Sequence, residues 1–273
     1  MPELTEYIIM SDFINQTSKD RIFAKAFNVE KGNIASEIDV GFNNFIVSSK
    51  SIGKELILDL NGMKIYVFMG MSGNWSYLPT SDWDSRKFVR LRLDDVYGGS
   101  LLLHGGFMGP RYSINKKFNG TKRGPDPTTN FDLFKENILK NIDSKAFDGL
   151  ICEALLNQEY FNGIGNYLRS TILYYSTSGP FENARVSIMS SNVLDLCRDI
   201  PLMSYKLNGG QLKDWKNPFN LESNSFDDWV FYQKGLSCKD KTGRTFWFDP
   251  KWKKYCPYII KNVNTIQRIN KKV

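Results

Sequence analysis

Apolar and polar residues are spaced differently in the first and second parts of the 273-residue chain. From about residue 22 to residue 104, the apolar residues form short runs that are typical of β-strands. The runs are residues 42–48, 55–60, 63–69, 87–93 and 100–104. Turn residues separate them, and Asn61-Gly62 between two runs is the strongest hairpin signal. Together with an opening helix over residues 3–18, this part predicts a sandwich or flattened barrel of antiparallel strands.

Helical spacing begins after residues 116–130, which are rich in Lys, Gly, Pro, Asn and Thr and are expected to be a linker. Apolar residues at i, i+3, i+4 and i+7 then predict helices. They cover residues 131–140, 144–159, 166–176 and 185–198, followed by a short helix at 226–233. Two strand-like pieces, 236–240 and 245–249, predict a final hairpin with Gly243-Arg244 near its tip. The expected fold class is therefore α+β, with four parts at residues 1–115, 116–130, 131–233 and 234–273.

The charge of the chain is concentrated at its end. The whole chain has 36 Lys+Arg and 29 Asp+Glu, a net charge of +7, but residues 239–273 alone contain ten basic and two acidic residues. The other 26 basic and 27 acidic residues nearly cancel. Aromatic residues alternate with the basic ones at 246–255, as on surfaces that hold phosphates and stack on bases. A solvated chain end is the competing interpretation.

Composition excludes several classes of protein. No run of about 18 uncharged apolar residues is present, and the first ten residues contain no basic residue, so neither a membrane helix nor a signal peptide is expected. The four cysteines are far apart and form no CxxC pair, which indicates reduced, intracellular thiols. A single histidine argues against Ser-His-Asp catalysis and against multi-histidine metal sites. We therefore expect an intracellular protein that is not secreted.

Residues 151–175 hold the most informative motif. Two apolar-faced helices flank the sequence Asn162-Gly163-Ile164-Gly165-Asn166, where the glycines permit tight turns and leave backbone N–H groups at the start of a helix. Such N–H groups bind phosphate because the helix dipole favours an anion there. From the residues alone, a unit that only packs two helices together is the favoured interpretation.

This motif, with the residues LNQEYFNGIGNYLRSTILYYS, closely resembles the helix-two-turn-helix of the formamidopyrimidine-DNA glycosylase and endonuclease VIII (Fpg/Nei) family. Four further segments resemble the same family in the same order: MPELTE at the start, GKEL and FMGMSG in the first half, and KTGRTFWF near the end. The last resembles the finger of zincless Nei-like members. The resemblance implies a β-sandwich catalytic domain (1–115), a linker, a helix-two-turn-helix domain (131–233), and a zincless finger with a basic tail (234–273).

The resemblance also implies a catalytic chain start. Removal of Met1 would expose Pro2 as a secondary amine, and an α-amino pKa near 7.7–8.0 leaves roughly 10–20% of it neutral at pH 7. That amine would attack C1′ of the damaged nucleotide and form an iminium, with Glu3 as general acid and base and Glu6 in a supporting role. From these residues alone, a frayed terminus with a proline at the start of a helix is the competing interpretation.

Further residues are implied to bind DNA phosphates: Lys54, which otherwise reads as a solvated turn lysine, Asn166, Arg244 at the finger tip, and the backbone of Gly163 and Gly165. Lys54 and Arg244 are thereby implied to take part in catalysis by positioning the lesion strand. The implied reaction is excision of oxidised pyrimidines through a Schiff base, followed by β,δ-elimination at the abasic site. Its implied partner is DNA that contains oxidised bases or abasic sites, bound by a monomer.

Met71 resembles the family residue that wedges into the gap left by an extruded base, although core filling is an equal alternative. Either the pair Arg111-Tyr112 completes the wedge in this chain, or the wedge is incomplete. An incomplete wedge predicts good activity on single-stranded or bubble DNA. Cys238 and Cys256 supply only two of four zinc ligands, so no metal or other cofactor is expected.

Two other classes of function remain open at this level. A non-catalytic protein that binds damaged or structured DNA would need the basic finger and the glycine turn, but neither a free Pro2 nor Glu3. An RNA-binding helix-two-turn-helix protein would lack the β-rich half. His104 is expected to be a structural histidine at a strand end.

Overall fold

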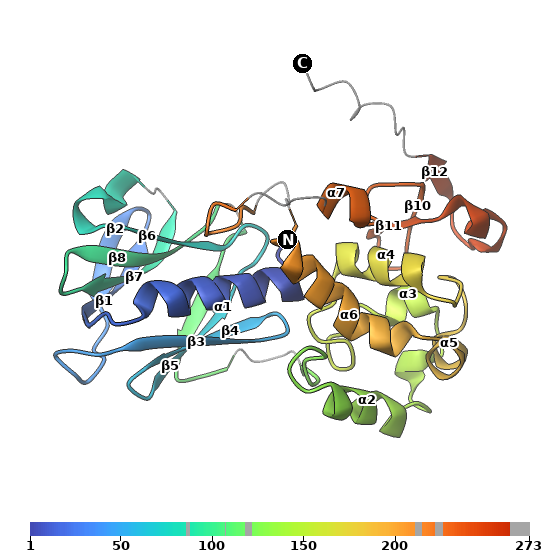
Figure 1. Ribbon diagram of the computed structural model, residues 1–273, viewed down its shortest axis with the longest axis horizontal. Helices are drawn as coiled ribbons and strands as arrows, with labels where there is room; N and C mark the ends of the chain where they lie inside the picture. Colours follow the sequence, from blue (N-terminus) through green and yellow to red (C-terminus); the bar gives the residue numbers. More distant parts are fainter. Residues whose placement is uncertain (86–87, 107, 118–121, 211–214, 222–225, 263–273) are drawn as a thin grey trace, which may run out of the picture. The chain divides into compact units, whose positions relative to one another are not determined.

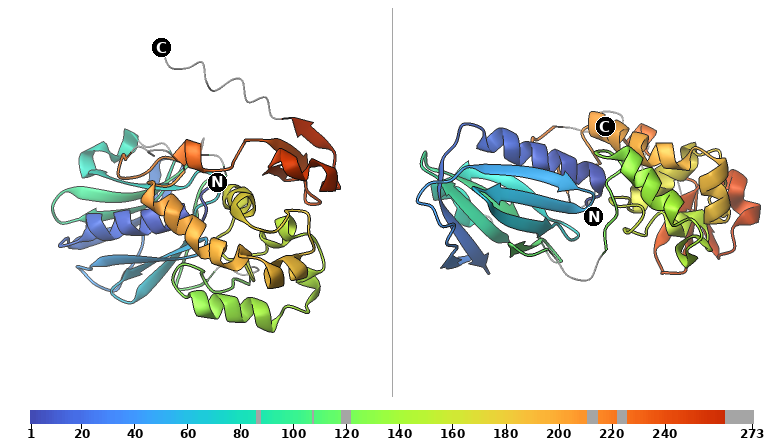
Figure 2. Two further views of the ribbon diagram at one scale, coloured as in Figure 1. Left: turned by 45° about the vertical axis from the view of Figure 1, so that its right-hand side comes forward. Right: turned by 90° about the horizontal axis from the view of Figure 1, so that it is seen from below.

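The computed structural model describes residues 1–85, 88–106, 108–117, 122–210, 215–221 and 226–262. The chain forms two compact units, which are drawn in Figures 1 and 2. The first unit consists of residues 1–121 and 204–227, and the second of residues 122–203 and 228–273. Among the described residues, no helix has the length and apolar character that crossing a membrane requires.

The first unit contains one long helix, α1 (Leu4–Ser18), and two antiparallel sheets (Figure 1). The five-stranded sheet has the order β2 (Asn33–Glu37), β1 (Phe23–Glu30), β7 (Val89–Asp95), β8 (Gly99–His104), β6 (Asn74–Pro79). The four-stranded sheet has the order β3 (Val47–Ile52), β4 (Glu55–Leu60), β5 (Met63–Phe68), β9 (Arg111–Ile114). A short 3-10 helix, η1 (Thr80–Ser85), follows β6.

One core joins these elements. The apolar side of α1, with Tyr7, Met10 and Ile14, packs with the inward-facing leucines of β4 and β7 in a single buried cluster. Alternation along the strands puts their apolar residues on this face. The predicted class, α+β with an antiparallel β-sandwich, is therefore confirmed.

Several strands were missed or misplaced by the sequence pattern. The run 42–48 was wrong as a strand, because Phe45 only bridges to Phe23 and β3 begins at Val47. Strand β2 is exposed at every position, so it carries no apolar alternation that could reveal it. Strands that lie at a sheet edge bury little surface and leave a weak sequence signal. This applies to β2, β3, β6 and β9, each of which ends the order of its sheet.

The second unit is mainly helical. Its helices are α2 (Phe131–Lys140), α3 (Ile151–Ala154), α4 (Asn166–Tyr175), α5 (Ala184–Ser190) and most of α6 (Val193–Lys206), with α7 (Phe226–Trp229) at the unit boundary and η2 (Lys145–Phe147) before α3. The finger consists of β10 (Leu236–Lys239), β11 (Thr245–Phe248), η3 (Pro250–Tyr255) and β12 (Ile260–Asn262), with β10 in the middle of the sheet.

The predicted helix 144–159 is wrong. Leu150 is extended and bridges to Asn183, while the N–H of Ala184 donates to the carbonyl of Gly149 at 2.8 Å. This pairing with a later segment interrupts the helix, although apolar residues such as Phe147, Ile151 and Leu155 are still buried. The predicted helix 185–198 is likewise split, because α5 ends at Ser190 and α6 begins at Val193.

The first unit includes residues 204–227, whereas the sequence assigned them to the helical domain. Trp215 is buried in the core of the first unit, and Phe219 packs edge-on against Phe13 with ring centroids 5.3 Å apart. The side chain of Asn74 donates to the carbonyl of Lys216 at 2.8 Å. The described part of this segment thus belongs beside α1 and β6, and the predicted domain limits remain a prediction.

Candidate active site

The start of α1 is buried. Pro2 and Glu3 are both buried, Glu3 with 4% exposure, while Met1 is 47% exposed. Glu3 caps the helix in a reciprocal arrangement with Glu6: each side chain accepts a hydrogen bond from the backbone N–H of the other, and Glu3 N to Glu6 Oε2 is 2.7 Å. A frayed terminus would expose these residues, so this interpretation of the first residues is wrong.

Glu6 connects this helix start to a distant turn. Its carboxylate is fully buried, and Oε1 accepts a hydrogen bond from the N–H of Gly210 at 3.0 Å. The preceding Gly209 has φ +75°, and a Cβ there would lie 2.7 Å from Ile9 Cδ1 and 3.4 Å from Glu6 Oε1. Only glycine fits this conformation and this space. No pattern in the sequence indicated that Gly209-Gly210 lies beside the chain start.

Lys54 lies in the turn between β3 and β4 and is only 8% exposed, so the solvated-lysine interpretation is wrong. Gly53 before it has φ +58°, which the turn requires. Asn15 in α1 makes two hydrogen bonds with the backbone of Ser49 in β3, of 2.9 and 2.7 Å, and so fixes helix to strand. The β3–β4 turn lies beside the start of α1 in Figure 1 and in the right view of Figure 2.

Met71 lies on a loop that also reaches the start of α1. The N–H of Met69 donates to the hydroxyl of Tyr7 at 2.9 Å, and the N–H of Met71 donates to the carbonyl of Met108 at 2.9 Å. Gly70 has φ +60°, and a Cβ there would lie 2.3 Å from that carbonyl oxygen. Met71 is 37% exposed and Met108 is 65% exposed. The structure therefore favours a surface role for Met71 over core filling, and it adds Met108, which the sequence did not single out.

Arg111 and Tyr112 are strand residues in β9, opposite Phe68 and Val67 of β5. Arg111 is exposed, with its guanidinium 5.6 Å from the centre of the Phe68 ring. Tyr112 packs against the core of the sandwich, and its hydroxyl donates to Asn28 Oδ1 at 2.9 Å. Burial, with a contribution from a nearby glutamate, raises the pKa of Tyr112 to about 12. Tyr112 therefore lines an internal cavity, and its role as a wedge remains a prediction.

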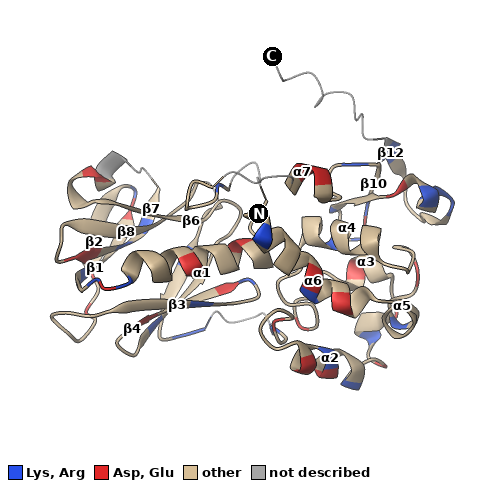
Figure 3. Ribbon diagram, viewed as in Figure 1, with Lys and Arg blue, Asp and Glu red and all other residues tan. Residues whose placement is uncertain are grey.

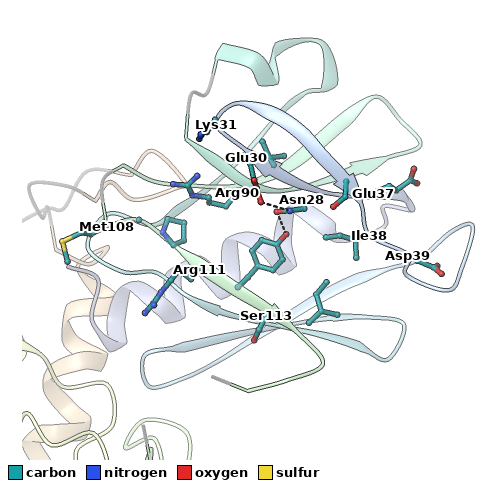
Figure 4. Close-up of a pocket in the computed structure, with 16 residues that line it drawn as sticks. Asn28, Glu30, Lys31, Glu37, Ile38, Asp39, Arg90, Met108, Arg111 and Ser113 are labelled. Carbon is teal, nitrogen blue, oxygen red and sulfur yellow. Dashed lines mark hydrogen bonds between the residues drawn. The ribbon is translucent and has the colours of Figure 1, made fainter. Parts of the chain in front are cut away.

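That cavity has a volume of about 1170 Å³ and opens between β1, β2 and β9. Figure 4 shows Arg90 and Arg111 toward Met108, and Glu37 and Asp39 at the opposite side. None of the residues at the start of α1 or in the β3–β4 turn lines it. Pro2, Glu3 and Lys54, the candidate catalytic residues of the first unit, thus lie outside this cavity.

In the second unit, the glycine turn presents Asn166 as the first residue of α4. Gly163 has φ +95°, and its N–H donates to the side chain of Gln158 at 3.0 Å. Gly165 is the residue before the helix and is extended. Asn166 Nδ2 donates to the carbonyl of Thr245 in β11 at 2.8 Å. The structure therefore brings Asn166 to the finger, 79 residues further along the chain.

Arg244 is exposed at the tip of the hairpin between β10 and β11. The turn is closed by Gly243, which has φ +78°, and its N–H donates to the carbonyl of Asp240 at 2.9 Å. A pocket of about 420 Å³ lies beside the tip and is lined by Arg244, Lys241 and Lys145. The predicted hairpin and its tip are therefore present. Arg244 precedes Thr245, whose carbonyl accepts the hydrogen bond from Asn166.

Three basic residues of the finger, Lys251, Lys253 and Lys254, are exposed on η3 (Figure 3). The predicted tail residues Arg268, Lys271 and Lys272 lie outside the described residues. Cys238 is buried in β10, and burial is the main cause of the raised pKa of its thiol. Within the described ranges, no three His, Cys, Asp or Glu side chains come together as metal ligands.

Comparisons with known proteins give relatives over almost the whole chain. Human endonuclease 8-like 1 is 30% identical over 295 residues, which cover 91% of the chain and 72% of that protein. The mouse endonuclease 8-like 1 is 29% identical over 288 residues, with the same coverage. No family model matches the chain.

Solved structures show the same fold. The Lactococcus lactis Fpg bound to DNA with an abasic site has a TM-score of 0.72 at 18% identity, and covers 91% of this chain and 98% of its own. MutM (FPG) from Thermus thermophilus has a TM-score of 0.72 at 17% identity, and covers 92% and 98%. The motifs at the chain start, the glycine turn and the finger agree with these matches, and the chain belongs to the Fpg/Nei family of formamidopyrimidine-DNA glycosylases and endonuclease VIII enzymes.

Proposed function

We propose that this DNA glycosylase of base excision repair, which is also an abasic-site lyase, acts through the amine of Pro2 once Met1 has been removed. Glu3 is its general acid and base. The observation that carries the proposal is the buried start of α1, where the Glu6 carboxylate fixes the backbone of Glu3 at 2.7 Å. A reactive terminus needs such a fixed geometry, because a nucleophile that moves freely loses most of the rate gained by proximity.

The reaction follows from the chemistry of a secondary amine. The lone pair of the Pro2 nitrogen attacks C1′ of the damaged nucleotide, and the base departs with its bonding electrons. Glu3 protonates the opening sugar, and the nitrogen becomes a positively charged iminium. The iminium acidifies the C2′ proton, so its removal expels the 3′ phosphate. A second elimination expels the 5′ phosphate, and hydrolysis returns the free amine.

The phosphates of the lesion strand are held by Lys54, Asn166 and Arg244. Lys54 is supported by its position in the β3–β4 turn near the chain start, where an ammonium at 8% exposure can donate a charge-assisted hydrogen bond to a phosphate. Asn166 and Arg244 are supported by their position at one end of the second unit, where the first turn of α4 meets the finger tip. Phosphate contacts of this kind set position and leave the choice of base to other residues.

The substrates are proposed to be oxidised pyrimidines, such as thymine glycol and dihydrouracil, with 8-oxoguanine cleaved more slowly. The proposal rests on the resemblance to Nei-like members and is supported by the 30% identity to an endonuclease 8-like protein. Single-turnover assays with thymine glycol, dihydrouracil and 8-oxoguanine in the same duplex test it. Faster excision of the two pyrimidines, with products of β,δ-elimination, is expected, and excision of the purine lesion alone would contradict it.

A Glu3→Gln variant serves as the control for catalysis, since it keeps the helix cap while removing the proton donor. Unchanged excision by this variant would contradict the role of Glu3. Lesion binding without excision by the wild type, with Met1 removal verified by mass, would indicate a non-catalytic damage-binding protein. The enzyme is proposed to act as a monomer wherever DNA is repaired, in a nucleus, a bacterial cytoplasm or a site of viral replication.

A further inference from the structure

A fully buried arginine lies in the middle of the second unit, in α4. Arg169 has 0% exposure, and its Nη1 donates to Asp240 Oδ2 at 2.7 Å and to the carbonyl of Cys152 at 2.9 Å. Its Nη2 donates to Asn166 Oδ1. The guanidinium also lies 4.9 Å from the centre of the Phe246 ring. Arg169 lies within the helix-two-turn-helix motif, but the sequence pattern gave it no role of its own.

Asp240 links Arg169 to the finger tip through hydrogen bonds. Its second oxygen, Oδ1, accepts the backbone N–H of Arg244 at 3.0 Å and both the N–H and the hydroxyl of Thr242, at 2.9 and 2.7 Å. Burial alone would raise the pKa of Asp240, but the hydrogen bonds from Arg169 and Thr242 outweigh it and the pKa is lowered. The ionised carboxylate thus fixes the turn that presents Arg244.

Asn166 is fixed by the same arginine from the other side. Its carboxamide oxygen accepts from Arg169, and one N–H of its nitrogen donates to the carbonyl of Thr245. An amide nitrogen has two N–H groups, so the second can donate to a phosphate oxygen. Arg169 therefore determines which way this group points, and at the same time it anchors the turn of Arg244.

Stability alone explains this arrangement poorly. A buried ion pair loses so much hydration that well-packed apolar residues are often equally stable or more stable in its place. Geometry is what such a pair can supply, because a planar guanidinium with several donors fixes all of its partners at once. We infer that Arg169 is a positioning residue, which locks Asn166 and Arg244 into one arrangement so that both can hold the phosphates of the lesion strand. This inference rests on the phosphate-binding role proposed above.

The experiment is a double-mutant cycle on the full chain. The dissociation constant for duplex DNA with a tetrahydrofuran abasic-site analogue is measured for the wild type, R169K, R244A and R169K/R244A. Lysine keeps the charge but cannot bridge three partners, and a displacement of about 1 Å at a positioned group can cost up to about 100-fold, so R169K is expected to weaken binding about 10- to 100-fold. In the R244A background, its effect is expected to fall several-fold, because contacts that work together are not additive.

Arg185 provides the matched control. It belongs to the same unit and pairs with Asp148 at 2.7 Å, but its side chain is 35% exposed and its hydrogen bonds go to Ile142, Ser144 and Asp148. R185K is expected to bind DNA like the wild type.

An R169K effect of equal size with and without Arg244 would show a general structural role and overturn the inference. If R244A and N166A themselves leave binding unchanged, the proposed phosphate role fails instead.

Two variants cover the case in which R169K does not fold, as judged by circular dichroism. D240N tests the bridge from its other end, and T242A removes only the hydroxyl donor of an exposed residue. Both are expected to weaken binding, T242A by about two- to fivefold, the scale of one modest hydrogen bond. Both effects are expected to shrink in the R244A background, and full additivity of both would overturn the inference.

Discussion

The buried carboxylate of Glu6 gives the sharpest test of how the chain start is held. Its two oxygens accept the N–H of Glu3 at 2.7 Å and the N–H of Gly210 at 3.0 Å. In a Glu6→Gln variant, an NH2 group replaces one of the two oxygens. This NH2 group cannot accept a hydrogen bond from the backbone N–H that faces it. The loss of one hydrogen bond to a charged group, with a buried N–H left unpaired, costs about 2–4 kcal/mol.

This cost has two measurable consequences. For a unit of this size, ~2–4 °C are lost per kcal/mol, so the melting temperature of the first unit is expected to fall by about 4–16 °C. Since a displacement of ~1 Å at a reacting group can cost about 100-fold in rate, single-turnover excision at saturating enzyme is expected to slow by about 10- to 100-fold. Affinity for abasic-site DNA is expected to stay within about twofold, because the phosphate-binding side chains are untouched.

The assay combines thermal melts by circular dichroism, single-turnover cleavage of thymine glycol duplex, and fluorescence anisotropy for DNA affinity. Glu37→Gln is the matched control, since Glu37 is exposed in β2 of the same unit and the same substitution there should cost less than about 0.5 kcal/mol. If Glu6→Gln melts and cleaves like the control, the two hydrogen bonds do not fix the chain start, and the reasoning is refuted.

Three further predictions concern other parts of the site. Lys54→Ala should reduce the slope of log affinity against log salt concentration by about 1, measured by anisotropy on abasic-site DNA, and an unchanged slope would contradict a phosphate contact. Gly209→Ala should be less stable in urea than Gly41→Ala; both have positive φ (+75° and +79°), so the difference isolates the 2.7 Å contact that only Gly209 would make. The pKa of Asp240 is lowered in the folded chain, so its contribution to stability is present above the ordinary value of 3.8 and is lost as the pH falls through the lower folded value. Urea midpoints from pH 7 to pH 3 should therefore decrease less in an Asp240→Asn variant, and equal decreases would contradict this.

Elements that depend on local signals were predicted closely. The β4–β5 hairpin spans residues 55–68 with Asn61 and Gly62 both at positive φ, as the turn chemistry indicated. Helix α2 matches its prediction at 131–140, and its capping residue Asn130 accepts a hydrogen bond from the backbone of Leu133. In each case neighbouring residues decide the conformation.

Features that depend on distant contacts were not predictable. The helix expected at 144–159 is interrupted because Leu150 pairs with Asn183, and the residues around Leu150 do not indicate that pairing. The hydrogen bond between Glu6 and Gly210 joins residues 204 positions apart. The contacts of Arg169 with Asp240 are of the same kind, since a buried arginine in a helix looks like any surface arginine in a sequence. The motifs identified candidate residues, and the fold determined what holds them.

The central claim is that the amine of Pro2 forms the covalent intermediate. Its most direct test is reduction with borohydride in the presence of abasic-site DNA, followed by mass spectrometry of the trapped peptide, on a chain whose loss of Met1 has been verified by intact mass. A chain that carries an uncleaved N-terminal extension, which turns the amine into an amide, is the control. The account predicts a cross-link on Pro2 of the processed chain and none in the extended chain. A cross-link on a lysine, or equal trapping of both chains, would contradict it.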